Sequence, residues 1–459
     1  MMKHKVVGLI STMSLDSTWA PEVIKRVSDT HFRVKEIIEK TGYTVLDEGS
    51  ITREYRDMED AGRKLRARGI KALVIYVGTW TYANCAVAAA LQADVPVIIW
   101  GDAEPGTCGL VGSSIVRGGM SEYGIYANLL YGPFDDEATR KRLAHLLNAA
   151  TAAKGLDGAV MGLGGGRSMG MVTAVCDPNR FKKQFGIEVD SFEQSDIINL
   201  AEGIDDKTVY DFFDWIKATF GKVIAKEDVM LKQIKLYLAL KEFCEKKSYD
   251  FVAIKCLPEL PFIYTTFCLA HAIMGDSEDA YGEKERFVLA CEADVNAAVT
   301  MQLMLNLTNQ PVMFTDLTQY DFEAGVLTTC NCGSQPTDFA KSKEDVYWEI
   351  EGVHEFDWKY GGCCPQHVGK PGEVTMARLY GNDGQYEMLI TRAEAVDMPR
   401  EKLKETIWER PHTYFKLKTE KEKFFESVRS NHIHVVYGDW TEDIAEACRV
   451  LGIKPVIVK

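Results

Sequence analysis

The chain of 459 residues has neither a long apolar run nor a surplus of basic residues. No stretch approaches the ~18–20 consecutive apolar residues that a helix needs to cross a bilayer. Asp and Glu number 67 against 53 Lys and Arg, which gives a formal net charge of −14. Nucleic acids and anionic membrane surfaces attract basic proteins, so the composition argues against both as general partners.

Two further signals are missing from the sequence. The apolar stretch near the N-terminus is only about six residues long and no small-residue cleavage site follows it, so we expect no signal peptide. The 12 cysteines form no tandem Cys-x-x-Cys pattern, and we expect reduced thiols rather than a zinc site in "CNCG" (330–333) or "GGCCPQH" (361–367). We therefore expect a cytoplasmic protein.

The first third of the chain alternates between strand-like and helix-like segments. The strand-like segments "VVGLIST" (6–12), "KALVIYVG" (71–78) and "VPVIIWG" (95–101) are almost uniformly apolar. Such strands are buried on both faces, which is typical of a parallel sheet with helices on both sides. The helical segment after the first strand begins at Pro21 and ends at Gly42, in accord with the usual start and stop signals.

The alternation restarts near residue 137 and ends near residue 320. A glycine-rich loop in "DGAVMGLGGG" (157–166) is followed by "SMGMVTAVCD" (168–177), where we predict a helix. After about residue 320 come short β-like runs with glycine turns. We therefore predict an α/β fold with two parallel-sheet α/β domains and a C-terminal antiparallel β-barrel-like domain, with bounds at 1–135, 136–320 and 321–459.

Two carboxylates stand where apolar runs stop. Glu292 ends "RFVLACE" and Asp316 ends "PVMFTD", with a helix-like segment between them. In a parallel βαβ unit both strand ends lie at the same edge of the sheet, so adjacent strands would bring these carboxylates together. Two close carboxylates repel each other unless a proton or a cation lies between them. A hard divalent cation, with a histidine as third ligand, would satisfy both.

Spacing alone leaves a second interpretation of these residues open. Glu292 would then be a solvated strand end and Asp316 a helix N-cap. We expect the neighbouring Asp294 and Asp321 to cap helices.

Three segments resemble the L-fucose isomerase family, in its broader L-fucose/L-arabinose isomerase-like grouping: "ACEADVNAAVTM", "MFTDLTQY" and "NHIHVVYGD". The resemblance covers most of the chain, because "GTWTYANCAVAAA", "GGRSMGM" and "GEVTMARLYGNDGQYEM" also occur in the family's order. It implies that Glu292, Asp316 and His432 bind one Mn²⁺, or another divalent cation such as Mg²⁺ or Co²⁺. The second domain would then carry the carboxylates and the C-terminal domain the histidine.

The resemblance also implies residues that contact substrate. Ser168 matches a serine that touches sugar hydroxyls, and Asn431 precedes the metal-binding histidine. Trp80 matches a tryptophan that reaches a neighbouring subunit's site, which implies a homo-hexamer or trimer with shared active sites and subunit contacts from the first domain. A core position on a βα loop stays open for Trp80. Arg167, next to Ser168, is a candidate anchor for an anionic substituent, and a surface or structural role for it stays open.

Two other features of the sequence bear on its chemistry. His432 and His434 are expected to face opposite sides of a strand, so that only His432 points into the metal cleft and His434 is structural. The loop "GLGGGRSMG" (162–170) lacks the lysine of a phosphate-binding loop and the spacing of a dinucleotide fingerprint. We therefore expect no nucleotide binding, and a sugar dehydrogenase is not favoured.

The implied function is a metal-dependent aldose–ketose isomerase that acts on a free sugar. It would move a proton between C1 and C2 through a cis-enediol, with Glu292 and Asp316 as both ligands and proton-transfer pair. The family's fucose-specific members carry an arginine in the first βα loop, whereas "STMSLDSTWAPEV" (11–23) has none, which argues against L-fucose as the substrate. The alternatives are an arabinose-like sugar, an acidic or sulfonated 6-substituted hexose of the sulfoquinovose type, and a non-catalytic sugar-binding relative.

Overall fold

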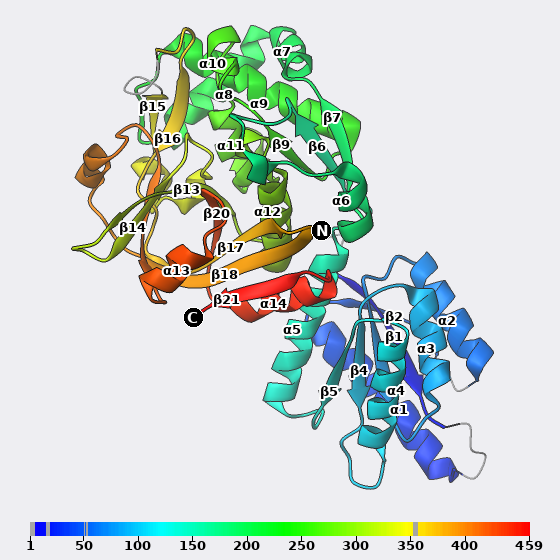
Figure 1. Cartoon of the computed structure of the whole chain (residues 1–459). Helices are drawn as coiled ribbons and strands as arrows, with labels where there is room; N and C mark the ends of the chain where they lie inside the picture. Colours follow the sequence, from blue (N-terminus) through cyan, green and yellow to red (C-terminus); the bar gives the residue numbers. More distant parts are fainter. Residues whose placement is uncertain (1–4, 15–18, 50, 52–53, 352–356) are drawn as a thin grey trace. The chain divides into compact units, whose positions relative to one another are not determined.

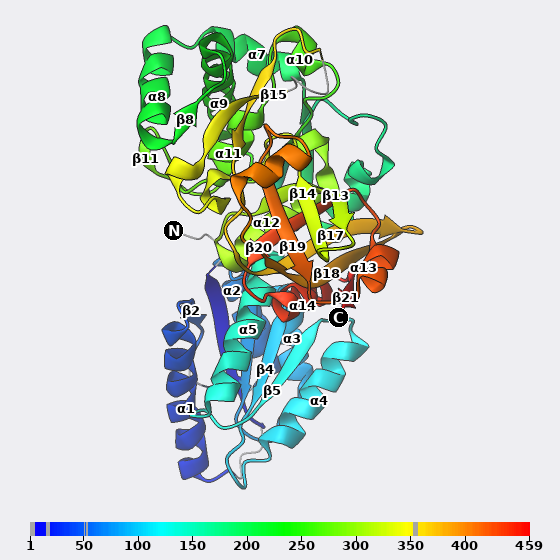
Figure 2. The same cartoon turned by 90° about the vertical axis from the view of Figure 1, so that its left-hand side faces the viewer.

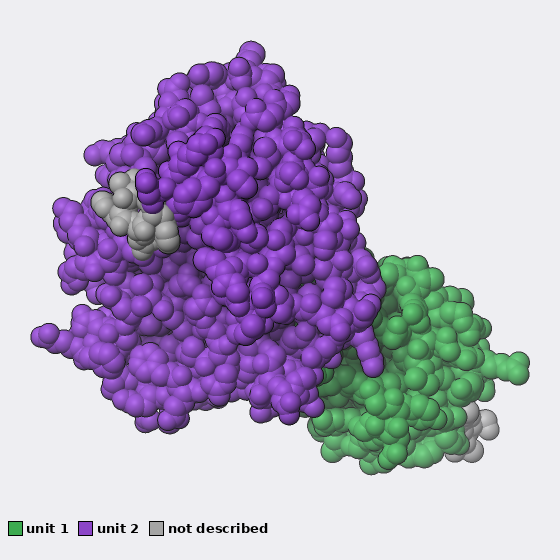
Figure 3. Space-filling view, turned by 45° about the horizontal axis from the view of Figure 1, so that its top comes forward, with its two compact units in different colours: residues 1–157, 446–452 green, residues 158–445, 453–459 purple. Residues whose placement is uncertain are grey.

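The computed structural model describes residues 5–14, 19–49, 51, 54–351 and 357–459 (Figure 1). The chain divides into two compact units, drawn in green and purple in Figure 3. The first holds residues 1–157 and 446–452, and the second holds residues 158–445 and 453–459. The division into domains at 1–135, 136–320 and 321–459 stays a prediction.

The first unit is built on a five-stranded parallel sheet in the order β2-β1-β3-β4-β5. Its strands are β1 (Val6–Thr12), β2 (Thr44–Asp47), β3 (Ala72–Val77), β4 (Val97–Gly101) and β5 (Ala127–Tyr131). Its helices are α1 (Pro21–Lys40), α2 (Tyr55–Ala67), α3 (Ala83–Ala93), α4 (Gly109–Glu122) and α5 (Glu137–Lys154).

Helices cover both faces of this sheet (Figure 2). Side chains of α1 and α5, such as Val27, form one core with the strands, and those of α2, α3 and α4, such as Leu65, form a second core on the other face. Helices α2 and α3 approach closely at Gly62, where a Cβ would lie 2.2 Å from the carbonyl oxygen of Ala89. The predicted parallel sheet with helices on both sides is confirmed for this unit.

The second unit begins with a four-stranded parallel sheet in the order β12-β9-β6-β7. Its strands are β6 (Val160–Gly164), β7 (Glu188–Phe192), β9 (Phe251–Ile254) and β12 (Leu289–Ala290). The helices of this part are α6 (Pro178–Phe185), α7 (Gln194–Glu202), α8 (Asp206–Thr219), α9 (Glu227–Lys247), α10 (Leu260–Ile263), α11 (Cys268–Gly275) and α12 (Val295–Thr308).

The prediction of a helix at residues 168–177 is wrong. Only a single 3₁₀ turn forms there, at Val172–Ala174. Met169 and Gly170 have positive φ angles of 44° and 72°, which an α-helix excludes.

The C-terminal part folds as a seven-stranded sheet in the order β17-β20-β13-β14-β19-β18-β21, with an additional pairing between β17 and β18. Neighbours are antiparallel except β18 and β21. A large C-terminal sheet is therefore confirmed, but a barrel is not, because the strands are not arranged evenly around one axis. The strands are β13 (Met313–Asp321), β14 (Val326–Cys330), β17 (Gly372–Asn382), β18 (Gln385–Ala395), β19 (His412–Leu417), β20 (His432–Tyr437) and β21 (Lys454–Val458).

Short elements complete the second unit. A three-stranded sheet has the order β16-β15-β8, and β10 pairs with β11. Their bounds are β8 (Lys222–Val223), β10 (Glu278–Asp279), β11 (Gly282–Glu283), β15 (Tyr347–Glu351) and β16 (Gly362–Gln366). Helix α13 (Lys421–Ser427) belongs to the same unit, whereas α14 (Thr441–Val450) has residues in both units.

Helix α12 connects the two larger sheets of the second unit. It contacts β12 and β9 of the parallel sheet as well as β17 and β20 of the antiparallel sheet. The side chains from Val295 to Met301 are all buried, as expected for a helix covered on all sides. The prediction that the strands before and after this helix form a parallel βαβ unit is wrong. Strand β12 belongs to the parallel sheet, whereas β13 pairs with β14 and β20 in the antiparallel sheet.

A candidate metal centre between two sheets

Glu292 lies one residue beyond the end of β12, in a 3₁₀ turn at Cys291–Ala293. Its backbone is left-handed, with φ 58° and ψ 24°, and Ala293 follows with φ 51°. Non-glycine residues in this region cost free energy and occur mainly where the surrounding structure holds a functional side chain in place. The turn points the Glu292 side chain into the interior, where it is 5% exposed.

Asp316 reaches the same point from the antiparallel sheet. It lies within β13, directly opposite His432 of β20, and its other neighbour in the sheet is Cys330 at the end of β14. Side chains opposite each other in an antiparallel pair lie within contact distance. The register of three strands therefore brings Asp316 and His432 together.

The structure places Glu292, Asp316 and His432 around one point. His432 Nε2 lies 3.2 Å from Glu292 Oε2 and 3.4 Å from Asp316 Oδ1, and one ligand atom of each residue lies within 4.8 Å of the others. Within the described part of the chain, neither His432 Nε2 nor Glu292 Oε2 has a hydrogen-bond partner of good geometry. Two carboxylates and one imidazole with unused lone pairs fit a divalent cation that keeps open coordination positions.

A buried ion pair fixes the orientation of the His432 ring through its Nδ1 atom. Its Nδ1 donates to Asp294 Oδ2 at 2.7 Å, which leaves Nε2 free for a ligand. Asp294 in turn pairs with Arg378 at 2.8 Å, and the side chains of both are almost completely buried. Although burial acts in the opposite direction, Arg378 and His432 hold the pKa of Asp294 well below its usual range. The carboxylate that orients His432 therefore stays ionised.

The site attracts positive charge. Burial lowers the pKa of His432, but the contacts with Asp294, Glu292 and Asp316 outweigh it and raise this pKa to about 10. Burial raises the pKa of Glu292, with Cys332 and Asp316 acting in the same direction and His432 against it. A proton or a metal ion bound at Nε2 supplies the positive charge that these groups favour.

Two amides fix the orientation of Asp316. The Nδ2 of Asn331 donates to Asp316 Oδ2 at 2.5 Å and lies 3.4 Å from Glu292 Oε1, and Ser334 donates to Asn331 Oδ1 at 2.7 Å. Asn431 donates to Asp316 Oδ1 at 2.8 Å. The sequence indicates Asn431 as a candidate site residue, but it gives no signal for Asn331. Only the pairing of β13 with β14 brings the segment after Cys330 to Asp316.

The predicted substrate-binding residues lie in different surroundings. Ser168 is buried and its hydroxyl donates to the carbonyl oxygen of Leu257 at 2.9 Å. Arg167 is exposed on the same loop. This loop leads to Met171, whose sulfur lies 3.9 Å from Asn431 Nδ2, so it adjoins the metal centre. Trp80 belongs to the first unit, where it is 37% exposed and meets Tyr82 edge to face.

Two smaller expectations about this region are wrong. His434 faces the same side of β20 as His432, because side chains two residues apart on a strand share a face. The ring of Phe314 contacts both histidines, at centroid distances of 4.4 and 5.3 Å. His434 also lies 3.3 Å from Arg378 and is completely buried, in accord with a structural role.

Of the two aspartates expected to cap helices, one does so. Asp294 is the N-cap of α12 and accepts from the N–H of Ala297. Asp321 instead caps the turn between β13 and β14, where it accepts from the N–H groups of Glu323 and Ala324.

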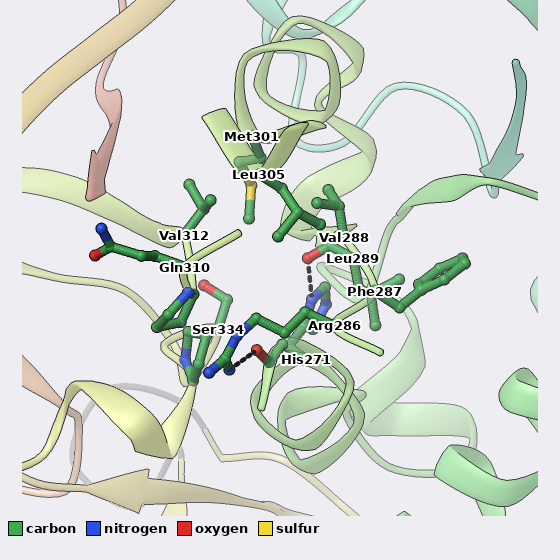
Figure 4. Close-up of a pocket in the computed structure, with 13 residues that line it drawn as sticks. His271, Arg286, Phe287, Val288, Leu289, Met301, Leu305, Gln310, Val312 and Ser334 are labelled. Atoms are coloured by element: carbon green, nitrogen blue, oxygen red, sulfur yellow. Dashed lines mark hydrogen bonds between the residues drawn. The ribbon is translucent and has the colours of Figure 1, made fainter. Parts of the chain in front are cut away.

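A separate narrow pocket opens near α11 and the start of β13 (Figure 4). Apolar side chains such as Met301 and Leu305 line one side, and Arg286 and His271 lie on the other. Arg286 donates to the carbonyl oxygen of Gly275 and to Asp338, and His271 Nδ1 bonds the carbonyl oxygen of Leu289. Burial lowers the pKa of His271 to about 4. None of the three residues of the candidate metal centre lines this pocket.

The C-terminal part of the chain has a known counterpart. Residues 329–459 match the family described as L-fucose isomerase, C-terminal domain. This stretch includes Asn331, His432 and most of the antiparallel sheet. The resemblance to the L-fucose isomerase family inferred from the sequence is confirmed.

Comparison over most of the chain points to particular relatives, all described as sulfoquinovose isomerases. The protein of Priestia aryabhattai is 21% identical over 378 residues, which cover 78% of this chain and 79% of the relative. That of Alkalicoccus urumqiensis is 22% identical, covering 81% and 82%, and that of Clostridium sp. (strain MSTE9) is 23% identical, covering 82% and 83%. Both comparisons indicate an aldose–ketose isomerase. Among the described helices, none is long and apolar enough to cross a membrane.

Proposed function

We propose that this chain is a metal-dependent isomerase that interconverts a free aldose and its 2-ketose through a cis-enediol. The observation that carries the proposal is the convergence of Glu292, Asp316 and His432, with unused lone pairs on Glu292 and His432. These three residues would hold a divalent cation, Mn²⁺ in the first place. When bound, the cation would polarise the two adjacent oxygens of the open-chain sugar.

The two carboxylates would carry the proton. One of them takes it from C2 of the aldose, and a proton returns to C1 once the enediol has formed. Glu292 is held by its left-handed turn and Asp316 by the amides of Asn331 and Asn431, so both are fixed before substrate arrives. The buried surroundings keep water away from the enediol.

For the substrate, we propose a sulfonated or otherwise acidic 6-substituted hexose of the sulfoquinovose type. The relatives at 21–23% identity are described as sulfoquinovose isomerases. Arg167 is an exposed cation on the loop that adjoins the metal centre, and residues 11–23 offer no arginine in the first βα loop. A guanidinium is suited to a sulfonate, because its planar fork donates two parallel hydrogen bonds.

The first experiment offers the Mn²⁺-loaded protein a panel of neutral aldoses and sulfoquinovose and measures the ketose formed. We expect turnover of the sulfonated sugar, its loss after dialysis against EDTA, and recovery with Mn²⁺ better than with Zn²⁺, because two carboxylates and one imidazole suit a hard cation. Full turnover by protein that elemental analysis shows to be metal-free would contradict the metal requirement. Sugar binding without turnover would favour a non-catalytic relative.

The second experiment separates chemistry from substrate recognition. Glu292→Gln and Asp316→Asn are each expected to lower kcat by a factor on the order of 10²–10⁴, whereas Asp321→Asn, in the β13–β14 turn, is the control. Arg167→Gln is expected to raise KM for the sulfonated sugar and to leave that for a neutral aldose unchanged. Near-normal turnover by Glu292→Gln would remove this residue from the mechanism.

A further inference from the structure

A second group of metal-ligating side chains lies next to the candidate metal centre. Cys268, Cys332 and Glu351 come from α11, the segment after β14 and the end of β15. One ligand atom of each lies within 4.8 Å of the other two, and all three residues are buried. Cys268 Sγ lies 3.0 Å from Glu351 Oε2. Two sulfurs and one carboxylate oxygen are a donor set that thiophilic divalent cations prefer.

Glu351 is the unusual member of this group. It is 1% exposed, and burial raises the pKa of its carboxyl well above the usual range, with Cys332 acting in the same direction and Arg410 against it. Its Oε2 accepts from Thr266 at 3.1 Å and from Cys268, but within the described ranges Oε1 has no hydrogen-bond partner. Arg410 does not offset the burial, so an ionised Glu351 requires a further positive charge close by.

The sequence alone favours reduced thiols over a zinc site at "CNCG" (330–333), but from this geometry we infer a second, thiolate-containing metal site that takes Zn²⁺, with Cys268, Cys332 and Glu351 as its ligands. Charge balance supports a divalent ion, because two thiolates and one carboxylate are neutralised by Zn²⁺ together with Arg410, which acts electrostatically on both Cys332 and Glu351. The hydroxyl of Thr266, 3.1 Å from Glu351 Oε2, is a candidate for a fourth ligand.

Cys291 is a neighbour of this site rather than a ligand. Its Sγ lies 3.9 Å from that of Cys332, and with Cys332 and Glu292 it forms another group of potential ligands, but it forms none with Cys268 or Glu351. A neighbouring thiol can donate a hydrogen bond to a metal-bound thiolate, as outer partners of metal ligands commonly do. Cys291 and Cys332 adjoin Glu292 and Asn331 in sequence, so an ion held by Cys332 would also fix the segment that orients Asp316.

Donor chemistry would distinguish the two sites. The centre at Glu292, Asp316 and His432 offers oxygen and nitrogen and suits a hard ion, whereas the thiol site suits Zn²⁺ or Co²⁺. The inference does not depend on the proposed isomerase reaction, because metal–thiolate bonds can be measured without substrate.

The test uses the full-length protein produced in Co²⁺-supplemented medium. We expect the near-ultraviolet charge-transfer band of a cobalt–thiolate bond and, in zinc-supplemented medium, about one Zn²⁺ per chain that remains when Mn²⁺ fills the other site. Cys268→Ser and Cys332→Ser, which each leave one thiolate ligand, should each lower the intensity of the band by half or more. Cys291→Ser should keep it, and so should the control Cys244→Ser, which alters a buried thiol in α9.

Two results would overturn the inference. The first is folded wild-type protein that shows no cobalt–thiolate band and retains no zinc. This result would be decisive without any variant. The other is a band that keeps its full intensity in both Cys268→Ser and Cys332→Ser. Glu351→Gln provides a further check, since replacing a ligand should shift the visible cobalt spectrum while the thiolate band remains.

Discussion

Asp294 makes three kinds of contact at once. It caps α12, it accepts from His432 Nδ1 at 2.7 Å, and it pairs with the buried Arg378. A helix cap is worth about 1 kcal/mol, but the loss of one partner of a buried ion pair costs about 3–5 kcal/mol. The residue therefore connects the stability of α12 with the orientation of a proposed metal ligand.

Asp294→Asn is expected to weaken Mn²⁺ binding about 10–100-fold, because a neutral amide holds the imidazole less firmly. The helix cap survives, since Asn caps as well as Asp. Electron paramagnetic resonance of free Mn²⁺ during a titration measures the affinity. Asp321→Asn is the control, and an unchanged Kd in folded Asp294→Asn protein would show that this carboxylate does not position His432.

His367 gives a prediction about acid stability. It is completely buried, neither ring nitrogen has a hydrogen-bond partner among the described residues, and burial lowers its pKa to about 3, assisted by Arg400, Lys343 and His412. Below about pH 6.5 the imidazole is protonated in the unfolded chain, but it stays neutral in the folded chain down to about pH 3. The free energy of unfolding therefore falls as the pH falls from 6.5 toward 3.

His367→Gln should remove this part of the acid sensitivity. At pH 5 the removed contribution is roughly 2 kcal/mol, and at pH 8 it is absent. Thermal unfolding of both proteins at several pH values measures it as a difference in the slope of Tm against pH. Parallel slopes would mean that His367 is not held neutral in the folded chain.

At the scale of elements, the metal centre depends on the segment that follows β14. Gly333 in this segment has φ 117°, and a Cβ there would lie 2.7 Å from the Cβ atoms of both Cys268 and Cys364. The segment can therefore carry Asn331 to Asp316 only with glycine at this position. Gly384, in the β17–β18 turn, also has a positive φ of 77° but has open space around its Cα.

Gly333→Ala and Gly384→Ala form a matched pair. Both incur the backbone cost of about 1–2 kcal/mol for a left-handed L-residue, but only Gly333→Ala adds overlap worth about 1–3 kcal/mol. We expect Gly333→Ala to have the lower Tm and also weaker Mn²⁺ binding, because Asn331 moves. Equal effects of the two substitutions on both measurements would contradict the close packing at Gly333.

At the scale of the whole molecule, the residues assigned to the reaction are divided between the two compact units. Trp80 lies in the first unit, and Glu292, Asp316 and His432 lie in the second. Trp80 is partly exposed, and an aromatic face suits the C–H surface of a sugar. In the family that the sequence resembles, the corresponding tryptophan reaches a neighbouring subunit's site, and we propose the same here.

A mixing experiment tests this shared site. Trp80→Ala and Glu292→Gln proteins are each expected to be inactive, and exchange of subunits between them should restore partial activity. Some sites in a mixed oligomer then receive an intact metal centre and an intact tryptophan from different chains. The absence of recovery, with exchange verified by mass spectrometry, would place Trp80 outside any shared site.

The sequence by itself determined the parallel sheets of the N-terminal part, because apolar runs such as Val6–Thr12 and Ala72–Val77 are local signals of buried strands. It also marked Glu292, Asp316 and His432 as the candidate ligands, through motifs that resemble a known family. Their predicted meeting at the edge of one parallel sheet was wrong, although the residues do meet.

Only the tertiary structure decided how they meet. Asp316 joins His432 through pairing of β13 with β20, which lies more than 100 residues further along the chain, and no local pattern encodes such a pairing. The same holds for Asn331, for the Asp294–Arg378 pair and for the thiols of Cys268 and Cys332 beside Glu351. Each of these contacts joins residues on separate elements, so it exists only once long-range strand pairing and burial have fixed the fold.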